Sequence, residues 1–325
     1  MGKHWKDKAI PDRSKRRLLQ SIGQQFPCAK LLKLWGIRDD DGCRLCKRLH
    51  PEETPWQESL SHIQARCPAL RKPRIAVHHG IWRELLVSIS RNSKETHDNG
   101  DRKWYFPSAV SEETHIEWTV RQILVHLGLF TGLPRFTVEI TDFYARMNIT
   151  LTKDEITDFL SKRPDGVAFN ARGKRCVFLE FTRLMDSISS SEEGDWAESK
   201  EREKNERYAM HRYFIHHISK SVGRAWECTQ INFTVRARGS IKAAQFSERL
   251  QLLGVQDAKV RDTIRAATVS KTLTLSDVML KLFHVSVLRS PEWALSSLPT
   301  ELSNFQTSRY QLFKKITGPF MGLVN

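Results

Sequence analysis

Four residues with metal-binding side chains lie close together in the first quarter of the chain. Cys43 and Cys46 are separated by two residues, and His62 and Cys67 follow, which gives the spacing C-x2-C-x15-H-x4-C. A tight turn can direct both thiolates of such a pair at one ion, and three thiolates with one imidazole form a closed, tetrahedral zinc site. His50 is a competing ligand. The alternative is that these are ordinary buried cysteines with a chance histidine. We predict structural zinc.

Two acidic residues could form a second metal site. Pro164-Asp165 precedes an apolar run that starts at Gly166, and Glu180 lies near the end of the next run. If the two runs are the strands of one hairpin, both carboxylates lie at its open end. Oxygen ligands of this kind bind Mg2+ or Mn2+, which activates water and neutralises charge on a phosphodiester. The pair therefore indicates metal-assisted phosphodiester hydrolysis.

Pro-Asp followed 15 residues later by Glu also resembles the outline of the PD-(D/E)XK nuclease core. That outline has a lysine two residues after the second acid, where this chain has Thr182. Lys200, Lys204 and Tyr208 are spaced four apart and so lie along one face of a helix. An ammonium from this face could orient the attacking water or stabilise the phosphate. The alternative is that these lysines face solvent with the rest of a charged helix.

Apolar periodicity predicts the elements that must position these residues. Thr152 with Glu155 three residues later forms a capping box, which predicts a helix start. Short runs rich in Val, Phe and Leu predict an antiparallel hairpin over 166–169 and 175–182. A further strand is expected over 228–236. Helices are expected over 12–35 with a break at Pro27, 74–91, 113–129, 136–147, 152–161 and 195–220, with helical tendency to about 285.

We therefore expect an α/β (α+β) fold with a small mixed sheet flanked by helices. The predicted organisation is a basic helical segment at 1–39, a zinc module with its following helix at 40–92, and a polar linker at 93–107. A nuclease domain at 108–285 and a C-terminal extension at 286–325 complete it.

Composition favours a polyanionic partner. The 325 residues include 52 Lys and Arg against 37 Asp and Glu, a net charge of +15, and residues 1–50 hold 13 of these basic residues against 5 acidic ones. Nucleic acid fits this excess, and a solubilising basic tail is the alternative. The apolar fraction of 40% excludes a wholly disordered chain. No apolar run approaches the roughly 18 residues of a membrane span. Six cysteines favour a reducing compartment.

Several short segments occur in a familiar order: Leu31–Gly36, the cysteine and histidine spacing, Arg74 with His78 and His79, Arg163–Asp165, Leu179–Thr182, Lys204–Tyr208 and Val235–Gly239. Together they resemble the C-terminal part of site-specific non-LTR retrotransposon proteins that carry a restriction-like endonuclease. The similarity covers roughly residues 30–285. It implies a PD-(D/E)XK type core, preceded by a zinc-binding linker that helps to grip nucleic acid.

The resemblance implies a nuclease that nicks target DNA, so that the freed 3′ hydroxyl primes reverse transcription in the nucleus. It makes Asp165 and Glu180 the ligands of Mg2+ or Mn2+, Lys204 the displaced catalytic lysine and Tyr208 its companion, with Lys200 as a second lysine candidate. Contacts with nucleic acid are expected from Arg74, His78, Arg183 and Arg238. DNA is the expected partner and element RNA a further one.

The chain departs from this family in having no Ala-Asp-Asp type polymerase motif, so a polymerase region would be missing. This leaves open an excised fragment, a truncated element copy or a gene adopted by the host. Two other functions remain alternatives. The first is a nucleic-acid-binding protein that no longer cuts, and the second is an interaction protein whose zinc serves folding alone.

Overall fold

The computed structural model describes residues 26–93, 104–110, 118–130, 132–184 and 193–288. Its three strands are β1 (Gly166–Asn170), β2 (Arg175–Leu184) and β3 (Glu227–Arg236). The helices before the sheet are α2 (Ala29–Leu34), α3 (Arg44–Leu49), η2 (His62–Arg66), η3 (Pro68–Leu70), α4 (Arg71–Asn92), α5 (Pro107–Val110), α6 (Val120–His126), α7 (Leu133–Ala145) and α8 (Lys153–Ser161). Those after β2 are α9 (Glu193–Arg207), α10 (Ala209–Ser221), α11 (Ala243–Leu252) and α12 (Ala258–Leu288).

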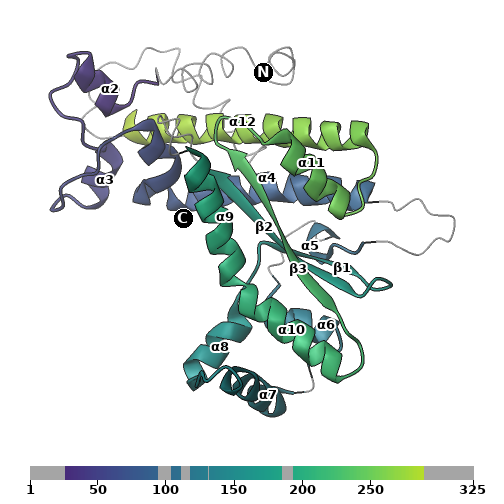
Figure 1. Cartoon of the computed structure of the whole chain (residues 1–325). Helices are drawn as coiled ribbons and strands as arrows, with labels where there is room; N and C mark the ends of the chain where they lie inside the picture. The colour runs from purple at the N-terminus through teal and green to yellow at the C-terminus, as the bar shows by residue number, and fades with distance from the viewer. Residues whose placement is uncertain (1–25, 94–103, 111–117, 131, 185–192, 289–325) are drawn as a thin grey trace.

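The strands form one mixed sheet in the order β1-β2-β3 (Figure 1). β1 and β2 are antiparallel, with Gly166 opposite Leu179, which confirms the predicted hairpin. β3 runs parallel to β2, and its register places Asn232 beside Glu180. Parallel neighbours need a crossover connection, and α9 and α10 supply it. The expected small mixed sheet flanked by helices is therefore present.

The two faces of the sheet pack into two apolar clusters, because successive side chains of a strand point to opposite faces. One face, which includes Val177 and Phe181 of β2, packs with buried side chains of α4, α11 and α12. The other face, which includes Phe178, packs with α6, α7, α8 and α10. Figure 1 shows α4 and α12 side by side along the first face, whereas the second group of helices forms a separate lobe. Of the acidic pair, Glu180 lies in β2 between these layers, and Asp165 immediately precedes β1.

The helices follow the sequence signals with some differences. Thr152 caps α8 in the predicted capping box with Glu155. The helix expected over 195–220 is interrupted at Tyr208, which separates α9 from α10. Within the helix expected over 113–129, the structure describes α6 from Val120 and leaves 111–117 outside the described residues. Residues 1–25 and 289–325, with most of the two expected terminal segments, also lie outside them.

The zinc module and the sheet share one core. The buried cluster that contains Cys43 and Cys67 also contains Trp82 of α4, Phe181 of β2 and Phe283 of α12. Part of the predicted linker belongs to this core as well, because Trp104 and Phe106 are buried. Residues 94–103 of that linker lie outside the described residues. The zinc module and the predicted nuclease domain are therefore packed together across the boundary expected between them.

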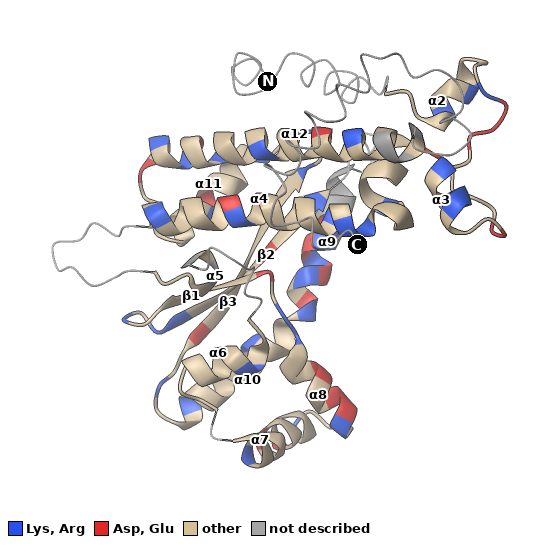
Figure 2. Cartoon of the chain, turned by 180° about the vertical axis from the view of Figure 1, so that it is seen from behind, with Lys and Arg blue, Asp and Glu red and all other residues tan. Residues whose placement is uncertain are grey.

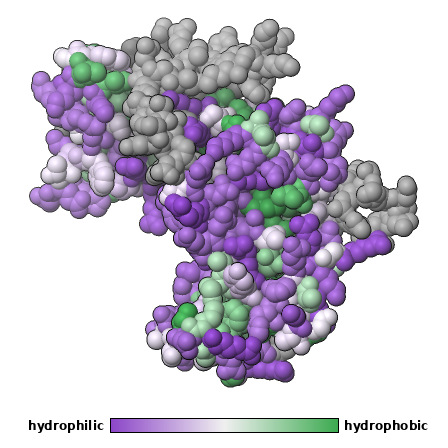
Figure 3. All heavy atoms as spheres, viewed as in Figure 1, coloured by the Kyte–Doolittle hydropathy of each residue, from purple (hydrophilic) through white to green (hydrophobic). Residues whose placement is uncertain are grey.

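The surface is mainly polar. Figure 2 shows Lys and Arg distributed along α4 and α12, whereas acidic residues gather on α8. Figure 3 shows a largely hydrophilic face with apolar groups over the lobe of α7 and α8. Leu133, Val138, Met147 and Ile149 are exposed apolar residues of this part of the chain. Among the described residues, no helix combines the length and apolar character that crossing a membrane requires.

Candidate functional site

The cysteines and histidine of the predicted zinc site converge. The ligand atoms of Cys43, Cys46, His62 and Cys67 all lie within 4.8 Å of one another, and all four residues are buried. The Sγ atom of Cys67 is 4.0 Å from that of Cys43 and 3.9 Å from that of Cys46. A tetrahedral zinc with Zn–S bonds of about 2.3 Å separates its sulfurs by about 3.8 Å. This Cys3His cluster can therefore hold a metal ion such as zinc.

Electrostatics within the cluster agree with a metal-binding role. The hydrogen bond with Cys67, together with burial, raises the pKa of Cys43 to about 12. The pKa of Cys67 is lowered, because it accepts that hydrogen bond. Burial and the charge of Cys43 raise the pKa of Cys46 to about 11. A bound cation replaces these shared protons and stabilises the thiolates instead.

The competing ligand His50 lies elsewhere. Its imidazole is exposed and faces Glu53, with 3.8 Å between Nδ1 and the carboxylate. The imidazole of His62 instead places Nε2 3.2 Å from Cys46 Sγ, and its other side stacks with Trp56. The structure therefore selects His62 as the fourth ligand.

A buried carboxylate organises the module around the cluster. Glu58 is fully buried and accepts hydrogen bonds from the backbone amides of Ala29 and Arg44, the first residues of α2 and α3. Its carboxylate also pairs with the guanidinium of Arg44 at 2.7 Å. One side chain thus caps two helices, which is favourable because a carboxylate stabilises a helix N-terminus. Sequence patterns gave no signal for Glu58, since its partners are distant in the chain.

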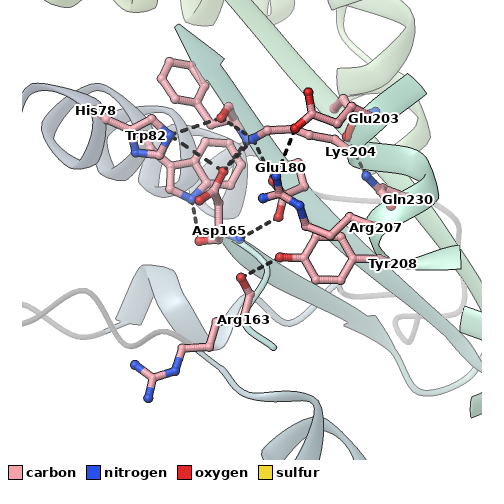
Figure 4. A network of polar contacts seen from close by, with 12 residues as sticks. His78, Trp82, Arg163, Asp165, Glu180, Glu203, Lys204, Arg207, Tyr208 and Gln230 are labelled. Carbon is pink, nitrogen blue, oxygen red and sulfur yellow. Dashed lines mark hydrogen bonds and ion pairs between the residues drawn. The ribbon is translucent and has the colours of Figure 1, made fainter. Parts of the chain in front are cut away.

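The acidic pair comes together as predicted (Figure 4). Asp165 immediately precedes β1 and Glu180 lies in β2, so the antiparallel register brings them to the same end of the hairpin. The Asp165 amide donates to Glu180 Oε1 at 3.1 Å, and the Phe181 amide donates to Asp165 Oδ2 at 2.8 Å. Glu180 is 2% exposed and Asp165 23%, so the site opens to solvent on the side of Asp165.

Lys204 of α9 binds both acids. Its ammonium lies 2.7 Å from Glu180 Oε2 and 3.2 Å from Asp165 Oδ2, and it donates to the carbonyl oxygen of Phe181 at 2.7 Å. Lys200 does not join this cluster, because its ammonium pairs with Glu203 on the same helix. Of the two lysine candidates, the structure therefore brings Lys204 to the acidic pair. The Lys204 ammonium thus comes from a helix, whereas Thr182 occupies the strand position where the nuclease outline has its lysine.

The two acids differ in protonation. Burial, together with the charge of Asp165, raises the pKa of Glu180 to about 7, although Lys204 opposes the shift. Burial also acts to raise the pKa of Asp165, but the charges of Lys204 and His78 outweigh it and hold that pKa below its ordinary value. A difference of this kind is expected for closely spaced carboxylates in a partly buried site. Asp165 is therefore the acid of the pair that loses its proton more readily.

α4 contacts the acidic pair directly. Trp82 donates its indole N–H to the backbone carbonyl of Asp165 at 2.7 Å. His78, one turn earlier, places Nε2 3.1 Å from the Phe181 carbonyl oxygen and 3.7 Å from Asp165 Oδ2. Gly166 permits this approach, since a Cβ atom there would lie 3.1 Å from the Trp82 ring. His78, which we expected to contact nucleic acid, thus lies within the acidic cluster.

Tyr208 bonds to the backbone next to the acidic pair. It is buried, and its hydroxyl donates to the backbone carbonyl of Arg163 at 2.7 Å. Burial and the nearby charges of Glu180 and Asp165 raise the pKa of its phenol far above the ordinary range, so it remains a neutral donor. The bond fixes the chain just before Asp165. Tyr208 is therefore a positioning residue in this structure.

The arginines expected to contact nucleic acid have different environments. Arg183 bonds to the carbonyl of Gln64 at 3.2 Å and to the hydroxyl of Ser276 at 2.8 Å, so it links the zinc module to α12. Arg74 lies in the first turns of α4, where burial lowers the pKa of its guanidinium. Arg238, which follows β3, is half-buried. Arg74 and Arg238 are therefore partly buried, whereas Arg183 spans two internal partners.

Sequence reasoning missed a polar chain beside Lys204. Asn232 of β3 is buried and donates to the side-chain oxygen of Asn205 at 2.9 Å, and Gln230 donates to Asn232 at 2.8 Å. Asn205 directly follows Lys204, and Asn232 lies beside Glu180 across the parallel strands. The sequence signal for this chain of contacts was the alternation of polar residues Gln230 and Asn232 in β3. Trp82 had a clearer one, since it lies one helical turn from His78.

Comparisons with known proteins add no family assignment. No protein-family model matches the chain, and no curated protein is significantly similar to it.

Proposed function

We propose that this protein is a metal-dependent DNA endonuclease that nicks its target by phosphodiester hydrolysis. The observation that carries the proposal is the convergence of Asp165, Glu180 and Lys204 at the open end of a hairpin. Asp–Glu–Lys clusters on a small mixed sheet are the outline of the PD-(D/E)XK nucleases that the sequence resembles. This likeness also supports a role in target-primed retrotransposition.

The donor set fits a hard divalent cation. Asp165 Oδ2, Glu180 Oε2 and the Phe181 carbonyl oxygen all face one point, and oxygen ligands are those that Mg2+ and Mn2+ prefer. In the proposed reaction these three groups hold the cation. The cation supplies charge neutralisation at the phosphate when it is bound. Lys204 orients the attacking water or stabilises the charge that develops on the phosphate.

Basic helices would hold the DNA backbone. α4 has five Lys or Arg residues against one Glu, and α12 has five against two Asp. Both helices flank the sheet that carries the acidic pair (Figure 2). Contacts of this kind hold the phosphates and do not read the sequence of the bases. The Cys3His module is continuous with α4 and adds a second anchoring point.

A plasmid nicking assay tests the proposal. Zinc-loaded protein is incubated with supercoiled DNA at low salt and with Mg2+ or Mn2+, since phosphate contacts weaken as salt rises. We expect the intact chain and Lys200→Ala to nick, and Asp165→Ala and Lys204→Ala to lose at least about 100-fold in rate. Nicking by Asp165→Ala at the intact rate would refute the assignment. Lys200→Ala is the matched control, because it removes an ammonium from the same helix outside the cluster.

One observation favours a second function, that of a nucleic-acid-binding protein that does not cut. The usual lysine position of the sheet holds Thr182, and Lys204 is bonded to three oxygens of the site. This alternative predicts that the intact chain and Asp165→Ala bind DNA equally and that neither nicks it under either metal. A filter-binding titration beside the nicking assay separates the two functions.

A further inference from the structure

The three oxygens that the proposed cation needs are the same three that hold the ammonium of Lys204. Nζ lies 2.7 Å from Glu180 Oε2, 2.7 Å from the Phe181 carbonyl oxygen and 3.2 Å from Asp165 Oδ2. The side chain is 16% exposed, so solvent does little to screen these contacts. A cation that took the same oxygens would face a positive charge at close range. Binding of the cation and binding of the Lys204 ammonium at these oxygens therefore compete.

Over its described side chains, the helix that carries Lys204 is held mainly by polar contacts. No side chain described in α9, from Glu198 to Arg207, is buried. Apart from the bonds of Lys204 itself, its contacts with the rest of the fold include ion pairs of Glu198 with Lys242 and of Glu201 with Arg249, and the Asn205–Asn232 hydrogen bond. Contacts of this type can be exchanged for contacts with water at small cost, unlike apolar burial. The end of the long lysine side chain can therefore move without repacking a core.

We propose that Lys204 and the divalent cation are alternative occupants of the same oxygens, so that cation binding displaces the Lys204 ammonium toward the phosphate. This inference rests on the proposed function, because it concerns the same site. It gives one side chain two successive roles. Before the cation binds, the Lys204 ammonium pairs with both acidic side chains. Afterwards its ammonium is free to contact the scissile group.

This exchange is possible because the lysine comes from α9 and not from the position in β2 that Thr182 occupies. A lysine two residues after Glu180 would project from β2 itself, on the same face of the sheet as Glu180, as Thr182 does. Lys204 instead approaches from α9, across the site from the strand. Its four-carbon stem can swing between the oxygens and the solvent side of Asp165, where the site is open.

Cation affinity tests the inference without activity. Tb3+, a hard cation that prefers oxygen ligands, is titrated into zinc-loaded protein with excitation through tryptophan, since Trp82 bonds to Asp165 itself. Emission that Asp165→Asn abolishes reports the site. We expect Lys204→Met to bind Tb3+ about tenfold more tightly or better than the intact chain, because the competing occupant is gone. Mg2+ competition should show the same order.

Lys200→Met is the matched control, and its affinity should equal that of the intact chain. Equal or weaker binding by Lys204→Met would overturn the inference, and so would the absence of site-specific emission from every variant. The nicking assay is read separately. Tighter binding by Lys204→Met with no nicking by the intact chain would keep the exchange and refute the endonuclease.

A second measurement needs no substitution, which matters if Lys204→Met fails to fold. A neutral amine-acylating reagent is applied to the intact chain with and without saturating Ca2+, and modified lysines are quantified by mass spectrometry. We expect acylation of Lys204 to become at least about fivefold faster with Ca2+, since its three hydrogen bonds are released, while that of Lys200 is unchanged. Unchanged or slower acylation of Lys204 would overturn the inference.

Discussion

The backbone amide of Asp165 donates a hydrogen bond to the carboxylate of Glu180, 3.1 Å away, although the two residues are 15 positions apart. The carboxylate of Asp165 accepts in turn from the amide that follows Glu180, at 2.8 Å. Each acid therefore fixes the backbone next to the other. These two hydrogen bonds link the strands at the open end of the hairpin. They hold the two carboxylates close enough for both to contact the Lys204 ammonium.

The pH dependence of stability should reveal the buried acid of this pair. The pKa of Glu180 in the folded chain is about 7, above its ordinary value of 4.5, so its contribution to stability is full below pH 4.5 and is lost as the pH rises through 7. Glu180→Gln does not titrate. Its stability relative to the intact chain should therefore rise by about 2 kcal/mol between pH 5.5 and 8. Urea unfolding without added Mg2+ measures this, over pH 5.5 to 8 to keep the zinc site intact.

Glu203→Gln serves as the control for that series, because Glu203 is exposed and its pKa is lowered by Lys200. Its stability relative to the intact chain should not increase over this pH range. A flat difference for Glu180→Gln would show that Glu180 is ionised in the folded chain throughout, contrary to the effect of its burial.

Loss of one zinc ligand should affect more than residues 40–70. Cys67→Ser should abolish bound zinc and lower the stability of the whole domain, because the cysteines belong to the same core as Trp82 and Phe283. Metal analysis of dialysed protein and thermal unfolding are the measurements. Cys28→Ser is the matched control, since Cys28 is a buried cysteine of the same core outside the ligand set. Zinc retained in full by Cys67→Ser would contradict the site.

Arg183 should prove structural. Arg183→Met removes the bonds to Gln64 and Ser276 and should cost about 1–3 kcal/mol of stability in urea unfolding. Arg183→Lys should recover only part of this, because an ammonium cannot span both partners as a planar guanidinium does. Salt titration of DNA binding gives the opposing test. A slope of log affinity against log salt that falls by about one, with unchanged stability, would instead make Arg183 a phosphate contact.

Removal of the Tyr208 hydroxyl should have a measurable effect on stability. Tyr208→Phe leaves the carbonyl oxygen of Arg163 without its 2.7 Å donor in a partly buried setting, which should cost about 0.5–1.5 kcal/mol in urea unfolding. Tyr213→Phe on the following helix is the control, since Tyr213 is 69% exposed and its change should stay within about 0.5 kcal/mol. Equal effects of the two substitutions would show that the buried hydrogen bond contributes nothing.

Local patterns were sufficient for much of the fold. The Thr152–Glu155 capping box and the hairpin that carries the acids depend on residues close in the chain, and both were predicted correctly. The spacing of the cysteines and histidine likewise identified the cluster, because tight turns set the directions of the ligands. The interruption at Tyr208 was not predicted, since it coincides with the hydrogen bond to Arg163, a partner 45 positions away.

The rest of the site depends on contacts that no short window contains. The parallel pairing of β3 with β2 brings Asn232 beside Glu180 across two intervening helices. The choice between Lys200 and Lys204 depends on which face of α9 meets the sheet, and two lysines one turn apart satisfy the same sequence pattern. The internal partners of Arg183 follow from the packing of α12 against the zinc module. Only the assembled structure distinguishes these cases.

α4 begins shortly after Cys67 and, near its middle, supplies His78 and Trp82 to the acidic pair. The ligand cluster thus adjoins the start of this helix, and the hairpin contacts its middle. Thiolates are the groups of this protein most readily oxidised, and their oxidation releases a bound metal. Loss of the metal would free the start of α4 and with it the indole that holds the Asp165 carbonyl. Oxidative conditions should therefore alter the position of Asp165 without any chemical change to the carboxylates.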